Sequence, residues 1–247
     1  YALVAVRAED ERECYEVVPG TVCVKQHAFE GQMHIQQVVL PEGVQQIEEE
    51  AFESCQALQR ISLPEGLTRM GADAFRCCIK LEGMELPASL KWLGEHALTD
   101  TYGWSPSMNG IQHITVQPEN PYFYNDAHAF YRRGEHGDTL IKYFGKIETW
   151  KIPKEVTEVG PMALRRANLR EVTIPETLKK IPKDAFQECG RLECMEIEAD
   201  QVKLYVPENP VYRKMEISGL FCQDADGNLR YDYAAYDALL QEWSQIL

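Results

Sequence analysis

The sequence predicts a repeat solenoid, in which short parallel β-strands of successive repeats stack on one another around a continuous core. Two observations support this fold class. Residues 35–55, 58–78 and 81–98 share one pattern of apolar positions, and the proline that follows each apolar segment recurs at positions 41, 64 and 87, a constant step of 23. The step is 22 between Pro153 and Pro175, so the repeat length is 22–23 residues.

A single repeat, residues 58–78, indicates how one coil is built. Apolar and polar residues alternate over residues 58–63, as expected for a short half-buried strand. Pro64 ends that strand because proline cannot donate to a strand ladder. Residues 73–78 are too few for a stable lone helix, and we predict one helical turn whose apolar side chains point inward. Each repeat is therefore expected to contribute one strand and one helical turn.

The helical turns place a large apolar residue at the same position of every repeat. We predict that these side chains form a buried ladder with one member per coil: Phe52, Phe75, Leu98, Leu164 and Phe186. One repeat cannot bury this side alone, and stacked neighbours supply the missing cover. The ladder is the core on which the fold prediction depends.

Three of the eight cysteines, Cys55, Cys78 and Cys189, fall three residues after the phenylalanine of the ladder. A free cysteine at such a position behaves as a small apolar side chain. The chain has no C-x-x-C pair, so the spacing of a zinc site is absent. We predict that these three thiols are reduced and buried.

The repeat also carries a resemblance to a known family. Residues 58–78 fit the pattern L-x-x-I-x-L-P-x-x-L-x-x-I-G-x-x-A-F-x-x-C, and residues 35–55 and 169–189 fit it nearly in full. This pattern resembles the BspA-type leucine-rich repeat of many bacterial surface proteins, and the match covers most of residues 17–197. The resemblance implies a leucine-rich-repeat solenoid, a cell-surface or secreted location, and a role in adhesion or in binding host or microbial macromolecules.

We predict a single domain with a solenoid over residues 1–200. Residues 1–30 form an N-terminal cap with a shortened first repeat, and residues 99–149 form a variant repeat with a β-hairpin insert whose tip is Gly134-Glu-His-Gly-Asp138. Residues 201–247 repeat the variant unit. They end in a capping helix that Asp232 would start, with apolar residues on one face: Tyr236, Leu239, Leu240 and Trp243.

Several classes of function are excluded by composition and motifs. The net charge of −14 would repel nucleic acid, and no apolar run reaches the roughly 18 residues of a membrane span. No nucleophile motif or phosphate-binding glycine loop occurs, so we expect no enzyme and no cofactor. The six histidines show no metal-ligand spacing. The segment Asp224-Ala-Asp226-Gly-Asn228 lacks the closing glutamate of a calcium loop and is expected to be a plain turn.

The outward side chains of the stacked strands are the first candidate binding surface. In register, the strands would present two rows. One contains Val39, Ser62, Glu85, Thr115, Lys151, Thr173 and Glu196, and the other contains Gln37, Arg60, Gly83, His113, Thr149, Glu171 and Cys194. Solenoids bind extended partners on such faces. The alternative is a polar face that only keeps the sheet soluble.

The aromatic insert is the second candidate, because interface hot spots favour tryptophan, tyrosine and arginine. We expect Tyr102 or Trp104 to be exposed beside the strand face, next to His113. The two candidates together give the predicted binding residues: Arg60, Ser62, Glu85, Tyr102, Trp104, His113, Thr115 and Lys151.

Function is predicted as a non-enzymatic, monomeric interaction module that binds a protein or another extracellular macromolecule. A cytoplasmic scaffold or regulator is one alternative, favoured by eight cysteines with no evident pairing. Another is a carbohydrate-binding protein that stacks sugars on insert aromatics: Tyr102, Trp104, Tyr122 and Tyr124. No metal ion, nucleic acid or membrane span is expected in any of these alternatives.

Overall fold

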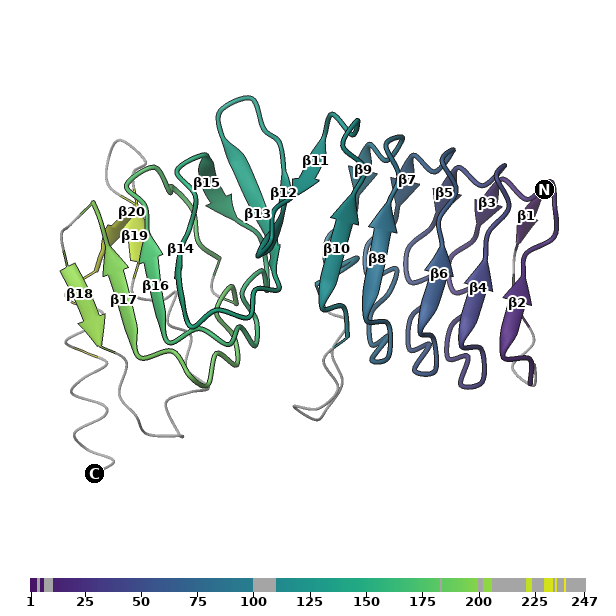
Figure 1. Ribbon diagram of the computed structural model, residues 1–247, viewed down its shortest axis with the longest axis horizontal. Helices are drawn as coiled ribbons and strands as arrows, with labels where there is room; N and C mark the ends of the chain where they lie inside the picture. Colours follow the sequence, from purple (N-terminus) through teal and green to yellow (C-terminus); the bar gives the residue numbers. More distant parts are fainter. Residues whose placement is uncertain are drawn as a thin grey trace. The chain divides into compact units, whose positions relative to one another are not determined.

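The computed structural model describes residues 1–3, 5–6, 11–99, 110–182, 184–199, 202–205, 221–223, 229–232, 234 and 238. It forms two compact units, Tyr1–Arg133 (unit 1) and Gly134–Leu247 (unit 2). Their described residues form short strands, most of them paired in parallel between successive coils (Figure 1). Each unit is thus built as the β-solenoid that the repeats predict. The assignment of the whole chain to a single domain stays a prediction.

The predicted strands of unit 1 pair in two groups, the first three strands and the last two, which together are called the first sheet. They are β2 (Cys14–Glu16), β4 (Gln37–Val39), β6 (Arg60–Ser62), β8 (Gly83–Leu86) and β10 (His113–Val116). Gln37 pairs with Arg60 and Gly83 with His113, so residues one repeat apart lie side by side. This is the register that the two outward rows require.

A second sheet of unit 1 was not predicted. Its strands, in spatial order, are β1 (Ala2–Leu3), β3 (Cys23–Val24), β5 (Gln46–Ile47), β7 (Arg69–Met70) and β9 (Trp92–Leu93). All pairs are parallel, and Figure 1 shows these arrows next to those of the first sheet. Each repeat therefore contributes two strands. The second has two residues, too few for an alternating pattern to be recognised.

The prediction of one helical turn per repeat is wrong. In the described residues, the segments that carry the ladder side chains form successive hydrogen-bonded turns and no helix. Residues in the left-handed region interrupt them: Glu50, Ser54, Asp73, Cys77 and His96 in unit 1, and Met162, Arg166 and Glu188 in unit 2. The amide N–H of Phe52 donates to the carbonyl of Ala74 in the next coil at 2.9 Å. Amides that bond to the neighbouring coil cannot make the bonds of a helix.

The predicted burial of the ladder residues is confirmed within each unit, and the register between Leu98 and Leu164 stays a prediction. In unit 1, Phe52, Phe75 and Leu98 are each at most 1% exposed, and Leu164 and Phe186 are buried in unit 2. The ring centroids of Phe52 and Phe75 lie 5.0 Å apart in a stacked arrangement. Phe29 of the shortened first repeat extends the stack, with its centroid 4.6 Å from that of Phe52.

The repeat-position cysteines are also buried and free, as predicted. Each thiol donates a hydrogen bond to the backbone of the preceding coil. The Sγ atoms of Cys55 and Cys78 lie 2.9 and 3.1 Å from the carbonyl oxygens of Phe29 and Phe52, and that of Cys189 lies 2.9 Å from the carbonyl of Leu164. Cysteine thus fills a small apolar space and satisfies a buried carbonyl there.

In the native protein at pH 8, Cys55, Cys78 and Cys189 should resist a maleimide reagent while the exposed Cys14 is alkylated. Burial raises the pKa of the Cys189 thiol to about 12 and raises that of Cys78, so the reactive thiolate is scarce as well as inaccessible. Peptide mass spectrometry before and after unfolding measures the reaction. Equal rates for all four thiols in native protein would contradict this assignment.

The variant repeat continues unit 1 through a buried amide. Strands β11 (Phe123–Asn125) and β12 (Ala129–Arg132) pair antiparallel. The Nδ2 atom of Asn120, which is 2% exposed, donates to the carbonyl oxygens of Pro87 and Leu90 at 2.9 and 3.0 Å, while its Oδ1 atom accepts two backbone N–H groups. The asparagine joins the regular coil to the variant repeat.

Unit 2 repeats the architecture with variations. Its strands are β13 (Asp138–Tyr143), β14 (Thr149–Lys151), β15 (Val156–Val159), β16 (Glu171–Ile174), β17 (Cys194–Ile197), β18 (Val202–Tyr205), β19 (Phe221–Gln223) and β20 (Leu229–Tyr231). Strands β14, β16 and β17 are parallel, and β18 pairs antiparallel with β17. Strands β12 and β13 flank the predicted hairpin tip, and the antiparallel pair β19–β20 is the hairpin of the second variant repeat.

Two predicted features of the C-terminal region lie outside the described residues. They are the tip of the second hairpin, residues 224–228, and the apolar face of the capping helix, formed by Tyr236, Leu239, Leu240 and Trp243. The capping helix therefore stays a prediction. In the part of the chain that the structure describes, no helix has the length and apolar character needed to cross a membrane.

Candidate functional site

The unit 1 strand face consists of the outward residues of β4, β6, β8 and β10: Gln37, Val39, Arg60, Ser62, Gly83, Glu85, His113 and Thr115. Thr115 pairs with Glu85, and Ser62 with Val39. Five of the predicted binding residues are exposed on this face: Arg60, Ser62, Glu85, His113 and Thr115. The stacked register thus gathers these five predicted residues into two adjoining rows.

A groove of about 580 Å³ lies at the N-terminal ends of the same strands. Gln59, Glu82 and Gln112, which immediately precede β6, β8 and β10, line it together with Arg60 and Lys80. Arg60 belongs to both the strand face and the groove. The two features therefore form one polar surface of unit 1.

The charged groups of this surface are not neutralised by one another. Among the described residues, the side chains of Arg60, Lys80 and Glu85 have no hydrogen-bond or ion-pair partner. Arginine presents five donors in a fixed planar arrangement, which suits carboxylate and carbonyl acceptors on a partner. The surface can therefore offer both donors and acceptors to a ligand.

The imidazole of His113 lies over Gly83 of the neighbouring strand. A Cβ atom added at Gly83 would stand 2.0 Å from Nε2 of His113, a distance that two such atoms cannot share. The missing side chain at position 83 thus creates the space that holds the ring against the sheet. The repeat step predicts that both residues lie in one row, but it does not indicate this contact.

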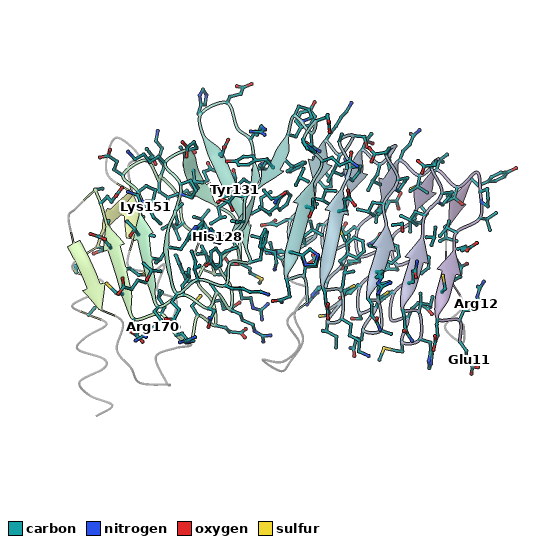
Figure 2. All side chains as sticks on the ribbon, in the orientation of Figure 1. Glu11, Arg12, His128, Tyr131, Lys151 and Arg170 are labelled. Carbon is teal, nitrogen blue, oxygen red and sulfur yellow. The ribbon has the colours of Figure 1, made fainter. Side chains whose placement is uncertain are left out.

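Lys151 belongs to unit 2, where the equivalent face differs in its electrostatics. Its ammonium group donates to the carboxylate of Glu198. On the loop before β16, Arg170 forms a two-point ion pair with Glu193, with both N···O distances 2.9 Å. Figure 2 labels Lys151 and Arg170. Because these cations already have acidic partners, they are less available to a ligand than Arg60.

The predicted aromatic site is only partly described. Tyr102 and Trp104 lie outside the described residues, so their exposure stays a prediction. Tyr122 is 44% exposed. Tyr124 is half-buried, its ring stacks on that of Tyr131 at 4.8 Å, and the guanidinium of Arg133 lies 4.4 Å from its centroid. Packing within unit 1 therefore occupies part of the surface of Tyr124.

A further exposed surface of unit 1 was not predicted from the sequence. The outward residues of β5, β7 and β9 form a further exposed row, Gln46, Arg69 and Trp92. These residues follow the prolines of their repeats by a constant five positions, and this spacing is the signal that could have revealed them. Because Trp92 is exposed, its ring does not contribute fully to the buried core of the solenoid.

A cluster of potential metal ligands also lies in unit 1. The ligand atoms of His27, Glu30 and Glu53 lie within 4.8 Å of one another. Arg76 already faces Glu53, with a nitrogen–oxygen distance of 3.4 Å, and His27 contacts both Glu30 and Glu50. These partners account for the cluster as an ion-pair network at the turns.

Comparison with known structures relates this fold to bacterial proteins. The crystal structure of the pneumococcal vaccine antigen PcpA is 19% identical with a TM-score of 0.54, over 78% of this chain and 62% of that one. A leucine-rich repeat protein from Eubacterium ventriosum is 15% identical with a TM-score of 0.53, over 79% and 65%. The chain thus spans less than two thirds of either protein. At these identities the likeness shows the fold.

Family comparison agrees with the repeat register. No curated protein sequence matches the chain. The model of the BspA-type leucine-rich repeat region matches in six copies, over residues 23–127 and 137–207. These residues are more than half of the chain, and they contain strands β3 to β11 and β13 to β18. The chain belongs to the BspA-type leucine-rich repeat family.

Proposed function

We propose that the chain is a non-enzymatic interaction module of a bacterial cell-surface or secreted protein, and that it binds a protein partner through the unit 1 strand face. The observation that carries the proposal is that Arg60 and His113 are both exposed beside the groove of about 580 Å³, on coils separated only by the coil of Gly83. Leucine-rich repeats form extended surfaces suited to macromolecular partners. The family assignment supports the interaction role, and the likeness to a bacterial vaccine antigen accords with a surface location.

Arg60 is expected to contribute most to binding. It is exposed, it has no acidic partner among the described residues, and it lines the groove. Arginine is enriched among hot-spot residues, whose truncation to alanine weakens the complex by about 2 kcal/mol or more. The neighbouring Ser62, Glu85 and Thr115 would surround it with smaller polar groups that set the register of the partner.

Arg60→Ala should weaken binding at least tenfold, about 1.4 kcal/mol, while the melting temperature stays nearly unchanged. The full chain would first be screened against an array of purified extracellular proteins. The dissociation constant for each hit would then be measured by biolayer interferometry. Gly83→Ala should also weaken binding, because the new Cβ displaces the imidazole of His113. Lys91→Ala, an exposed cation outside the groove, is the matched control.

The outcomes separate the alternatives. If Arg60→Ala and Gly83→Ala bind every hit as tightly as the unchanged chain, the unit 1 strand face is not the binding surface. If no extracellular protein binds at micromolar concentration, the interaction role assigned to this face is wrong. A loss of binding in Lys91→Ala of the same size would indicate general electrostatic attraction instead of a defined surface.

A further inference from the structure

The second sheet of unit 1 carries a groove of its own, of about 370 Å³, near the C-terminal ends of β3, β5 and β7. Polar residues of three coils line it, and Trp92 of the last strand in that sheet is also part of the lining. This is the second-sheet groove. It shares no residue with the unit 1 strand face or with the groove beside that face.

Trp92 is the aromatic surface of the second-sheet groove. Its side chain is 41% exposed, although a tryptophan in a solenoid gains most when it is buried. Arg69 pairs with it in register, and the guanidinium carbon lies 3.9 Å from the ring centroid. The stacking fixes both side chains, and the guanidinium of Arg69 has no acidic partner among the described residues. Its N–H donors remain available at the groove.

The lining of the second-sheet groove also includes acceptors, and the charge of one of them is partly compensated. Glu48 accepts a hydrogen bond from the ammonium group of Lys25 at 2.6 Å and another from the backbone N–H of Gln26 at 3.1 Å. The bond from Lys25 holds the pKa of the Glu48 carboxyl below its ordinary value. Glu49 is exposed and has no side-chain partner among the described residues. Gln46 adds an amide that can both donate and accept.

This set of groups matches the chemistry of a sugar ring. The C–H face of a pyranose packs on an exposed indole, and its hydroxyl groups donate to carboxylates and accept from amide or guanidinium N–H groups. An apolar ligand would leave Gln46, Glu49 and Arg69 without partners. A polyanion would meet Glu48 and Glu49 in a chain of net charge −14. The groove volume of about 370 Å³ lies within the range of about 300–1,000 Å³ that is usual for small-ligand sites.

We propose that the second-sheet groove binds a neutral oligosaccharide. Arg69 covers one face of the Trp92 ring, and the part of the ring that it leaves exposed supplies the stacking surface. Arg69 and Gln46 donate hydrogen bonds to ring hydroxyls, and Glu49 accepts from them. The site is independent of the proposed protein-binding function, because its residues lie on the other sheet of unit 1. A chain with both sites would engage a glycan and a protein through different sheets.

A glycan array probed with the full chain tests the proposal, followed by titration calorimetry with the strongest neutral oligosaccharide. Trp92→Ala should weaken binding at least tenfold, and Glu49→Gln should weaken it several-fold. Tyr122→Ala is the matched control, because it removes an equally exposed aromatic side chain of unit 1 that does not line the groove. Circular dichroism of each variant checks that the fold is retained.

The binding of the four variants either supports or contradicts a sugar site in the second-sheet groove. Binding that is lost in Trp92→Ala and Glu49→Gln but kept in Tyr122→Ala and Arg60→Ala supports the second-sheet groove. The proposal is wrong if no neutral glycan binds at millimolar concentration, if only acidic glycans bind, or if Trp92→Ala binds as tightly as the unchanged chain. Loss in Tyr122→Ala alone would assign the sugar to the aromatic insert. The protein-binding test with Arg60→Ala is unaffected by any of these results.

Discussion

Replacing Phe75 by alanine should lower the free energy of unfolding by about 3–5 kcal/mol. The phenylalanine is fully buried, and its ring stacks on that of Phe52 at a centroid distance of 5.0 Å. Its removal leaves a cavity between coils that a regular backbone ladder cannot close. Because each coil is stabilised by its neighbours, Phe52 loses its stacking partner as well. Denaturant titration followed by far-UV circular dichroism measures the change.

Val22→Ala is the control for this experiment. Val22 is 45% exposed, so shortening it should change the free energy of unfolding by no more than about 0.5 kcal/mol. A Phe75→Ala variant as stable as the unchanged chain would show that the ladder of Phe29, Phe52 and Phe75 does not form the core of unit 1.

Gly71→Ala should lower the free energy of unfolding by about 3 kcal/mol, near the upper end of the cost of overpacking. A Cβ atom at this position would stand 2.3 Å from the backbone nitrogen of Glu49 in the preceding coil. Backbone cannot move aside as a flexible side chain can, because its N–H and C=O groups are held in the ladders between coils. Thermal and denaturant unfolding measure the loss.

Gly43→Ala provides the matched comparison in the same unit. The nearest atom to a Cβ at Gly43 is the carbonyl oxygen of Thr21 at 3.3 Å, a tight contact that a small shift relieves. Its cost should stay within about 1 kcal/mol. If both glycine variants lose the same stability, the close contact between Gly71 and the backbone of Glu49 is not what makes Gly71 costly to replace. The lower backbone entropy of the unfolded chain would stabilise both variants, so it cannot account for a loss.

The unit 1 strand face shows how far sequence can predict a candidate site. The positions of Arg60, Ser62, Glu85, His113 and Thr115 in two rows followed from the repeat step alone, and the strand pairing confirms these rows. The ring of His113 over Gly83 did not follow from it. That contact depends on where the side chain lies between two strands, which a pattern of apolar positions does not record.

Lys151 shows the opposite case. It occupies the predicted outward position of β14, but its ammonium group donates a hydrogen bond to the carboxylate of Glu198. The two residues are 47 positions apart, about two repeats, and nothing in the pattern indicates that they meet. Ion pairs between coils are formed by exposed side chains, which the core does not hold in place. Which charged residues meet therefore depends on how the coils stack, and the repeat pattern does not predict it.

By itself, the sequence determined the coil and its core. Phe52, Phe75, Cys55 and Cys78 recur at fixed steps, and burial of apolar side chains requires equivalent positions of adjacent coils to meet. Tertiary structure alone decided the second sheet, the left-handed turns and the approach of Arg69 to Trp92. A strand of two residues is too short to show an alternating pattern. The position of Gly71 in the repeat is occupied by Lys25 and Glu48 in the two preceding repeats, so the residue type there does not predict the close approach of the backbones. The physical reason is that these features arise from close contact between backbones of different coils, a distance that residue type does not encode.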